Sequence, residues 1–325
     1  MSTRRCILFA LVALGTSLAS NLHAQEAWPK RPVRMVIASP GGSGPDVLLR
    51  VMTERVSQAL KQPVVVDNRP GANGHLATIE VAKAPADGYT VLFASAAGTV
   101  VNQALQPDLA LNVLAKFTPV AQIGAGGIHL VTSPDFPAAN LQEFIAYVKA
   151  NPGKLNYASW GVGSTGHLVM ESLKNQYKLD VRHVPYKSVP QIYQDMGGGI
   201  IKVAFVDATS SLPLIKNGKL KALGNTGTAR GPALPELATF TEQGVKFAAD
   251  GWYGVFVPKG TPDAVVSRLH REFLKVMMDP AMKERLLQFN MAHPPLKSPE
   301  EFCKTVAADL LLWQSIVKTN GIRIE

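Results

Sequence analysis

The chain has 325 residues, a formal net charge of +9 and an apolar content of 46%, but only two cysteines. Its positive charge is spread along the chain, and no zinc-finger, basic-helix or RNA-binding motif occurs, which argues against a nucleic-acid partner. Cys6 falls in the leader segment described next, so only Cys303 remains after processing, which excludes an intramolecular disulfide and a metal site built from paired thiolates.

The first 24 residues have the pattern of a cleavable export signal. Arg4 and Arg5 precede an apolar stretch over residues 6–18, shorter than the ~18 residues that a membrane-spanning helix needs. Small residues follow, and Ala24 ends a cleavage site before Gln25. The pattern predicts a protein that works outside the cytoplasm; a short buried N-terminal helix is the alternative.

Strand-like and helix-like segments alternate in the first part of the mature chain. Apolar runs at residues 33–38, 64–66 and 89–94 predict strands, separated by helices that begin at Gly44 and near Leu76. In the first helix the apolar positions trace one helical face. This βαβαβ pattern predicts a parallel sheet covered by helices.

The alternation restarts after a helix whose start is marked by Asn140 and Glu143, a capping-box pair. The elements predicted beyond it are a helix over residues 167–177, a helix that opens at Pro190, and strands at residues 155–159, 181–184, 203–206, 220–223 and 252–257. Helices that begin after Thr261 and Ser298 complete the chain. The chain that remains after removal of the export signal is longer than a single hydrophobic core usually supports, which favours two lobes.

Two glycine-rich loops share one design. Residues 40–44 (PGGSG) and residues 161–166 (GVGSTG) each follow a predicted strand and precede a helix. Such loops place free backbone N–H groups at a helix N-terminus, which binds anions. Tight βα turns are the simpler interpretation of one such loop, but two matching loops favour a site for an anionic ligand.

Enzymatic interpretations of these loops find little support. The second loop satisfies G-x-G-x-x-G, yet the acid that a dinucleotide site requires after the next strand is missing. Val162 stands where a nucleophile elbow around Ser164 needs glycine. The histidines are scattered, and no paired metal-ligand motif occurs, so neither a cofactor nor a metal is predicted.

Asp46 fits helix capping better than ligand contact, and Asp207 is either a cleft residue or a turn cap.

The chain resembles the Bug-type periplasmic solute receptors of tripartite tricarboxylate transporters. The stretches that carry the resemblance run in order through nearly the whole mature chain: PGGSGPD, VVVDNRPGANG, ADGYT, NPGKLNYAS, GVGSTGHL, HVPYK, GKLKALGNT, DGWYGVFVPKGTP and SPEEF. NPGKLNYAS and NRPGANG are the most specific of these.

The resemblance implies an α/β periplasmic binding protein fold with two lobes, each a sheet flanked by helices, and a ligand cleft between them. Residues 25–123 with 251–325 would form lobe one, and residues 124–250 lobe two. The implied ligand-binding residues, together with neighbours in the same loops, are Gly41, Gly42, Ser43, Gly44, Asp46, Ser95, Ala96, Thr99, Gly163, Ser164, Thr165, His167, Asp207 and Ser210.

The function implied is that of a monomeric, non-enzymatic periplasmic receptor. It would capture a small organic acid and deliver it to the membrane subunits of a tripartite tricarboxylate-type transporter. An exported hydrolase and a ligand sensor for a membrane signalling partner are the alternatives.

Overall fold

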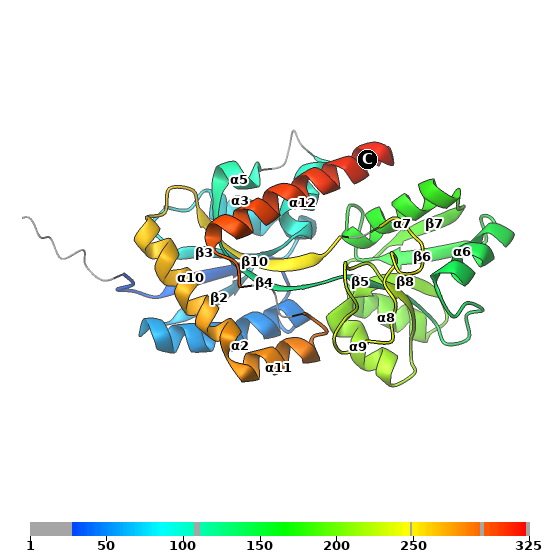
Figure 1. The fold of residues 1–325 in the computed structure, drawn as a ribbon, viewed down its shortest axis with the longest axis horizontal. Coiled ribbons are helices and arrows are strands. Elements are labelled where there is room, and N and C mark those ends of the chain that lie inside the picture. The colour runs from blue at the N-terminus through cyan, green and yellow to red at the C-terminus, as the bar shows by residue number, and fades with distance from the viewer. Residues whose placement is uncertain (1–27, 107–110, 248, 293–295, 323–325) are drawn as a thin grey trace, which may run out of the picture.

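Two separate five-stranded sheets divide the molecule into two lobes, which lie side by side along its long axis (Figure 1). The computed structural model describes residues 28–106, 111–247, 249–292 and 296–322; the predicted export signal, residues 1–24, lies outside them. We call the lobe built on the first sheet lobe one and the other lobe two. Both sheets are flanked by helices, which confirms the two-lobed α/β fold.

The sheet of lobe one has the strand order β2-β1-β3-β10-β4. Its strands are β1 (Val33–Ile37), β2 (Val64–Asn68), β3 (Thr90–Ser95), β4 (Phe117–Gly126) and β10 (Gly251–Pro258). β1 pairs in parallel with β2 and β3, whereas β10 is antiparallel to β3 and β4.

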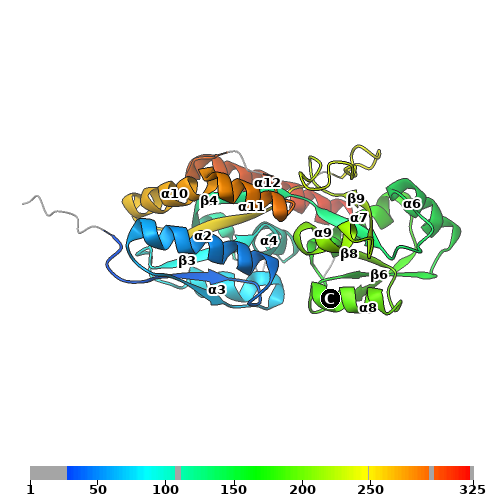
Figure 2. The ribbon, with the colours of Figure 1, turned by 90° about the horizontal axis from the view of Figure 1, so that it is seen from below.

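Helices cover both faces of this sheet (Figure 2). They are α2 (Gly44–Leu60), η1 (Ala72–Gly74), α3 (His75–Ala82), η2 (Ala97–Val101), α4 (Asn102–Leu105), α5 (Val113–Lys116), α10 (Asp263–Met278), α11 (Pro280–Gln288) and α12 (Pro299–Thr319). In α2 the predicted apolar face is the buried one: Leu49, Met52 and Val56 are fully enclosed.

The sheet of lobe two has the strand order β7-β6-β8-β5-β9. Its strands are β5 (Ile128–Thr132), β6 (Leu155–Ser159), β7 (Val181–Pro185), β8 (Val203–Asp207) and β9 (Lys221–Asn225). Its helices are α6 (Leu141–Ala150), α7 (Thr165–Tyr177), α8 (Val189–Gly197) and α9 (Ala208–Lys216). The predicted cap of α6 is present: the Asn140 side chain accepts a hydrogen bond from the Glu143 amide.

Both sheets are mixed: the parallel pairing predicted for the first three strands is present in β1, β2 and β3, but further strands of each sheet run antiparallel to their neighbours. β10 runs against its two neighbours, and β5 is antiparallel to β8 and β9. The reason is the connection between the lobes. β4 leaves lobe one and leads directly into β5, while β10 brings the chain back, so the leaving and returning strands lie antiparallel.

The crossing between β4 and β5 is tight. A Cβ atom at Gly127 would lie 2.0 Å from Asn225 Oδ1 and 2.1 Å from the Gly227 nitrogen, so only glycine fits there.

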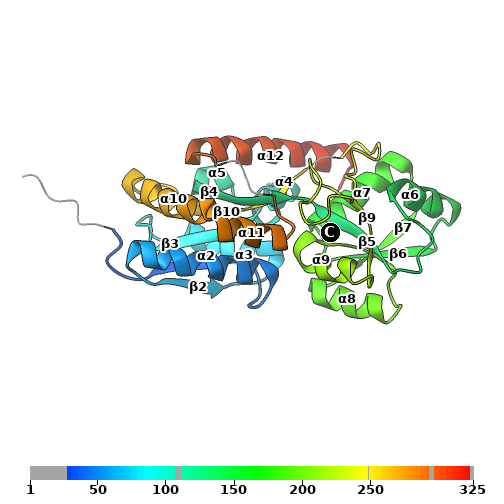
Figure 3. The ribbon, with the colours of Figure 1, turned by 60° about the horizontal axis from the view of Figure 1, so that its bottom comes forward.

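α12 adds a second bridge above the crossing strands and reaches from lobe one to lobe two (Figure 3). Phe302 near its start packs on Trp252, and Trp313 near its end packs on Phe247 in the segment before β10.

None of the helices in the described ranges is long and apolar enough to cross a membrane.

Candidate functional site

The first glycine loop leads into α2, and hydrogen bonds within the loop and to the first turn of this helix hold its backbone in place. Gly42 adopts a left-handed conformation (φ 77°), and its amide donates to Asp46 Oδ2 at 2.8 Å. Ser43 is the N-cap residue of α2, but its hydroxyl donates to the Pro40 carbonyl and caps no helix amide. No hydrogen bond among the described residues uses the Gly44 amide, which lies in the first turn of α2, where N–H groups have no partner within the helix.

Asp46 is a structural part of this loop. Its carboxylate is 2% exposed and also accepts hydrogen bonds from Arg50 Nε at 2.9 Å and from Asn68 Nδ2 at 2.8 Å. Burial alone raises the pKa of Asp46, but the hydrogen bonds from Arg50, Asn68 and the Gly42 amide outweigh it, so this pKa lies below its usual value. The capping-type role expected for Asp46 thus takes the form of a bond to the loop amide.

The second loop repeats the first. Gly163 has φ 76°, and its amide donates to His167 Nδ1 at 3.2 Å. Ser164 is the N-cap of α7, and its hydroxyl oxygen accepts from the His167 amide. Thr165 is the first helical residue and is half-buried, and no described residue accepts a hydrogen bond from its amide. The Gly44 and Thr165 amides therefore occupy equivalent positions in the two loops.

The Ser164 hydroxyl points into lobe two. Ser164 is 1% exposed, and its Oγ lies 2.9 Å from Ser159 Oγ, which in turn lies 2.8 Å from His183 Nε2. Because Ser159 separates the histidine from Ser164 and is itself fully buried, these three side chains do not form a nucleophile and its base.

The loop after β3 is largely internal. Thr99 is 2% exposed and donates to the carbonyls of Ser95 and Ala96, and Ser95 Oγ accepts from the Gly98 amide. Ser95 is half-buried and lies opposite Tyr253 of β10. Within this loop Ser95 and Ala97 are half-buried, whereas Ala96, Gly98 and Thr99 are buried.

The Asp207–Ser210 turn begins α9. Asp207 Oδ1 accepts from the Ser210 amide at 2.8 Å, the Ser210 hydroxyl donates to Asp207 Oδ2, and the Tyr193 hydroxyl lies 2.7 Å from Ser210 Oγ. Of the two roles considered for Asp207, the turn cap is present. Burial first, and then the negative charge of Asp207, raise the pKa of Tyr253.

Three contacts join these loops across the two lobes. A Cβ atom on Gly44 would lie 3.2 Å from Thr209 Cγ2, so the starts of α2 and α9 touch. Asn73 Nδ2 lies 3.4 Å from the Gly163 carbonyl, which joins η1 to the second loop. Thr209 Oγ1 donates to the Phe289 carbonyl after α11.

Sequence reasoning did not identify Asn73, Thr209 or Asn290 as residues of the lobe interface. Asn290 inserts its amide into lobe two, where Oδ1 accepts from the Ala233 amide and Nδ2 lies 3.2 Å from His129 Nε2. The one available signal was the Asn73-Gly74 pair, a dipeptide that favours left-handed backbone; Asn73 has φ 50° and Asn290 φ 53°.

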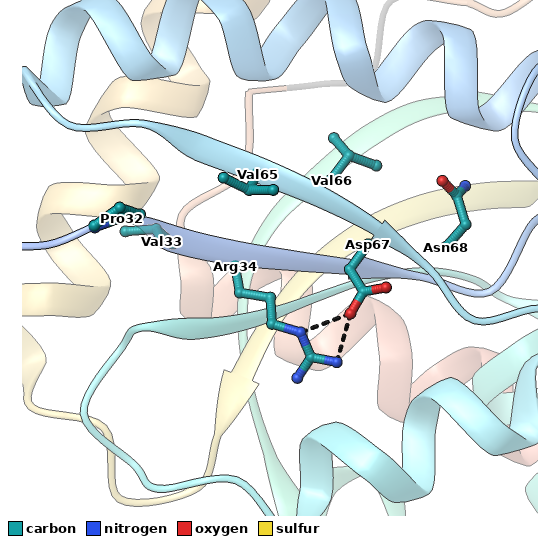
Figure 4. A pocket seen from close by; sticks show the side chains of 7 residues that line it. All are labelled: Pro32, Val33, Arg34, Val65, Val66, Asp67 and Asn68. Atoms are coloured by element: carbon teal, nitrogen blue, oxygen red, sulfur yellow. Dashed lines mark hydrogen bonds and ion pairs between the residues drawn. The ribbon is translucent and has the colours of Figure 1, made fainter.

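Two hollows lie away from the lobe interface. One of about 510 Å³ is lined by residues 32–34 and 65–68 on β1 and the edge strand β2, and the Arg34–Asp67 ion pair lies within it (Figure 4). The other, of about 540 Å³, is lined only by lobe-two residues such as Asn140 and Gln243. Neither joins the two glycine loops, so we do not assign the solute site to them.

No group of three or more histidine, cysteine, aspartate or glutamate side chains in the described part of the chain is arranged to hold a metal ion. The groups brought together at the lobe interface are backbone amides, hydroxyls, the side-chain amides of Asn73 and Asn290, and the carboxylates of Asp46 and Asp207, both of which accept hydrogen bonds within their own turns. This is chemistry that suits binding of a small anion through hydrogen bonds.

Comparison with known proteins identifies the family. Residues 48–322 match the family described as Tripartite tricarboxylate transporter family receptor. The chain belongs to this receptor family. Protein BugT of Bordetella pertussis (strain Tohama I) is 30% identical over 325 residues, which cover 99% of this chain and 99% of BugT, so the chain is a Bug-type receptor.

Solved structures of similar receptors carry bound acids. R. palustris Rpa4515 with adipate is 29% identical and covers 91% of this chain and 99% of its own, with a TM-score of 0.83. MatC (Rpa3494) from Rhodopseudomonas palustris with bound malate is 28% identical and covers 89% of this chain and all of its own, with a TM-score of 0.81. The Bug-type receptor described here is therefore similar in fold, over about nine tenths of its length, to a protein solved with adipate and to one solved with malate.

Proposed function

We propose that this Bug-type receptor binds a small carboxylate or dicarboxylate between its two lobes and delivers it to a tripartite tricarboxylate-type membrane transporter. The observation that carries the proposal is the pair of matching helix starts, at α2 and α7, each with an amide that bonds to none of the described residues. Each start carries about half a positive charge, which favours a carboxylate over a neutral ligand.

The proposed ligand site comprises the residues that line these loops and the lobe contacts. They are Gly41, Gly42, Ser43, Gly44, Asp46, Ser95, Ala96, Thr99, Gly163, Ser164, Thr165, His167, Asp207 and Ser210. Within this set we expect direct contact from Gly44, Thr165 and Ser95, while the buried Asp46 and Ser164 hold the loops in shape.

The energetics are adequate for a receptor. A hydrogen bond to a charged group contributes about 1.5–3 kcal/mol, so four or five of them, less the cost of ordering, reach about −8 kcal/mol, which corresponds to micromolar affinity. Binding of this kind needs no cofactor and no catalytic group. Adipate and malate in receptors 29% and 28% identical to this chain support the ligand class.

Capture requires that the lobes move. We propose that residues 25–123 with 251–325 move as one body and residues 124–250 as the other, in a monomeric protein. The contacts between Gly44 and Thr209 and between Asn73 and Gly163 would form only on closure. We also propose that residues 1–24 direct the chain to the periplasm and are removed there.

A thermal-shift screen tests the proposal. The mature chain is heated with succinate, malate, adipate, citrate, glutamate or benzoate, each at millimolar concentration. A ligand present at 100 times its Kd stabilises the native state by about 2.7 kcal/mol, so at least one acid should raise the Tm by several degrees. If none of these acids shifts the Tm of ligand-free protein, the carboxylate assignment is wrong.

A further inference from the structure

The two glycine loops have the same backbone but use different side chains to hold it. The N-cap serines, Ser43 and Ser164, have φ/ψ of −69°/160° and −66°/157°, and the glycine before each is left-handed. In both loops the glycine amide donates to the side chain four residues on. That acceptor is the Asp46 carboxylate in lobe one and the His167 imidazole in lobe two.

The two acceptors differ in what they require. Asp46 accepts as an anion, and Arg50 and Asn68 compensate its charge. His167 accepts through Nδ1, so Nδ1 must carry no proton and any ring proton must lie on Nε2. Nε2 lies 3.9 Å from Glu171 Oε1. A doubly protonated His167 loses the Gly163 bond, because both ring nitrogens are then donors.

His183 supports the second loop from behind. Its ring stacks on His167, with centroids 4.4 Å apart and planes at 19°, and on the other side it stacks on Tyr157 at 4.9 Å. Its Nε2 bonds to Ser159, which bonds to Ser164. His183 therefore contacts the imidazole that holds Gly163 directly, and it reaches the Ser164 hydroxyl that caps α7 through Ser159.

We propose that His167 and His183 are positioning residues for the solute site, which hold the Gly163–Thr165 backbone in its ligand-binding conformation while both imidazoles are neutral. The proposal rests on the proposed function, since it takes the Thr165 amide as a ligand contact. Neither residue is a catalytic residue, and each acts through the loop rather than through the ligand.

The surroundings keep both rings neutral. The ionisable groups that face them are Tyr157 of β6 and Glu171 and Lys174 of α7. Burial, the largest cause, lowers the pKa of His167; Glu171 opposes this and Lys174 adds to it. Burial, then the charges of His167 and Lys174, lower the pKa of His183 to about 3. At neutral pH the loop is thus in its supported state.

The test compares two substitutions of similar size at one position. His167→Asn keeps a neutral acceptor near the place of Nδ1, whereas His167→Leu removes it. Calorimetric titration uses the acid from the thermal-shift panel that raises the Tm most. We expect His167→Asn to bind within about threefold of the unsubstituted protein and His167→Leu to bind at least about tenfold more weakly. His270→Asn is the control, because His270 Nδ1 also bonds a backbone group, the Val120 carbonyl oxygen, but in lobe one and away from both glycine loops.

A second readout separates positioning from general damage to the fold. Amide hydrogen exchange at Gly163, measured by NMR without ligand, should be slow in the unsubstituted protein and in His167→Asn and fast in His167→Leu. Because burial lowers the pKa of His167 below its ordinary value of about 6.5, protonation removes this acceptor only at lower pH. As the pH falls from 6.5 to 4.5, the affinity of the unsubstituted protein should therefore fall relative to that of His167→Asn, which has no such acceptor to lose.

The outcomes distinguish the two proposals. Equal affinity and equal Gly163 exchange in the asparagine and leucine variants would overturn the positioning role and leave the receptor function intact. A protein that binds no acid of the panel even without substitution would instead overturn the proposed function, and the positioning role with it.

Discussion

Asp46 stabilises the first loop through one buried carboxylate. It accepts from the Gly42 amide, from Arg50 and from Asn68, and each partner belongs to a different local segment: the loop, α2 and the end of β2. A buried acceptor with several donors leaves those donors unsatisfied when it is removed, which costs more than the bonds themselves contribute.

We therefore predict that Asp46→Asn lowers the free energy of unfolding by about 1–3 kcal/mol, because the amide cannot accept from all three donors and loses its ion pair with Arg50. Urea denaturation of the two ligand-free proteins measures this loss in the free energy of unfolding. Asp135→Asn is the matched control, since Asp135 is largely exposed in its pair with Lys202 and should cause no measurable change. Equal midpoints for the two variants would contradict the structural role of Asp46.

Because His129 is buried, we predict that the free energy of unfolding depends on pH. It is fully buried, with Nδ1 at 2.9 Å from Ser211 Oγ and Nε2 next to Asn290 Nδ2, and burial lowers its pKa to about 4. Between about pH 6.5 and pH 4 the unfolded chain binds a proton that the native chain does not, so the free energy of unfolding falls as the pH drops through this window.

The loss attributable to His129 should approach about 1.4 kcal/mol per pH unit within that window. It is measured as the difference between the unsubstituted protein and His129→Asn in urea denaturation at pH 7, 6, 5 and 4. The variant removes this contribution while His167 and His183 remain in both proteins. A difference that stays constant from pH 7 to pH 4 would show that His129 does not titrate in this range.

At the scale of single residues, the sequence predicted where the two glycine loops lie but not the hydrogen bonds that hold them. Glycine and serine content marked both loops, since left-handed backbone and helix capping favour those residues. No local pattern predicts that Ser164 turns inward. Nor does one predict that Asp46 and His167 accept from a glycine four residues earlier, because both features depend on neighbours in the tertiary structure.

At the scale of elements, α12 joins the two lobes. Trp313 is 2% exposed and packs edge-on against Phe247 with ring centroids 6.1 Å apart, whereas Leu311, one half-turn away, is 67% exposed. The end of the helix is thus attached to lobe two, although its start packs on the lobe-one strand β10 through Trp252.

We predict that Trp313→Ala lowers the free energy of unfolding by about 3–5 kcal/mol, because it removes a large buried ring and leaves a cavity. Urea or thermal unfolding measures the loss. Leu311→Ala on the same helix should change stability by less than about 0.5 kcal/mol. Similar effects from both variants would mean that the end of α12 does not pack on lobe two.

Elements with a clear period were predictable, including the strand at residues 252–257 that forms β10, whereas β4 and β5 were not. The strands at β1, β2, β3 and β6 and the helices α2, α6, α7 and α12 follow the expected order. The pattern over residues 117–132 predicts no strand, because glycines and a proline interrupt the alternation of apolar and polar residues, yet these residues form β4 and β5. The antiparallel course of β10 likewise depends on a connection through the other lobe.

At the scale of the whole molecule, the two lobes contact each other where the starts of α2 and α9 meet. A methyl group added at Gly44 would press on the Thr209 methyl across the interface, at 3.2 Å. Alanine otherwise suits this helical position, so the substitution should leave each lobe folded. The position therefore reports on closure rather than on folding.

The most direct measurement is a calorimetric titration of three proteins with the acid that the thermal-shift panel identifies: the unsubstituted chain, Gly44→Ala, and Gly44→Ala with Thr209→Ser. We predict one bound acid per unsubstituted chain with micromolar Kd and about tenfold weaker binding for Gly44→Ala. Affinity should return to within about threefold in the double variant, because serine lacks the obstructing methyl but keeps the hydroxyl that bonds the Phe289 carbonyl. Failure of the unsubstituted chain to bind, or equal affinity in all three proteins, would contradict capture of a carboxylate by closure of the two lobes.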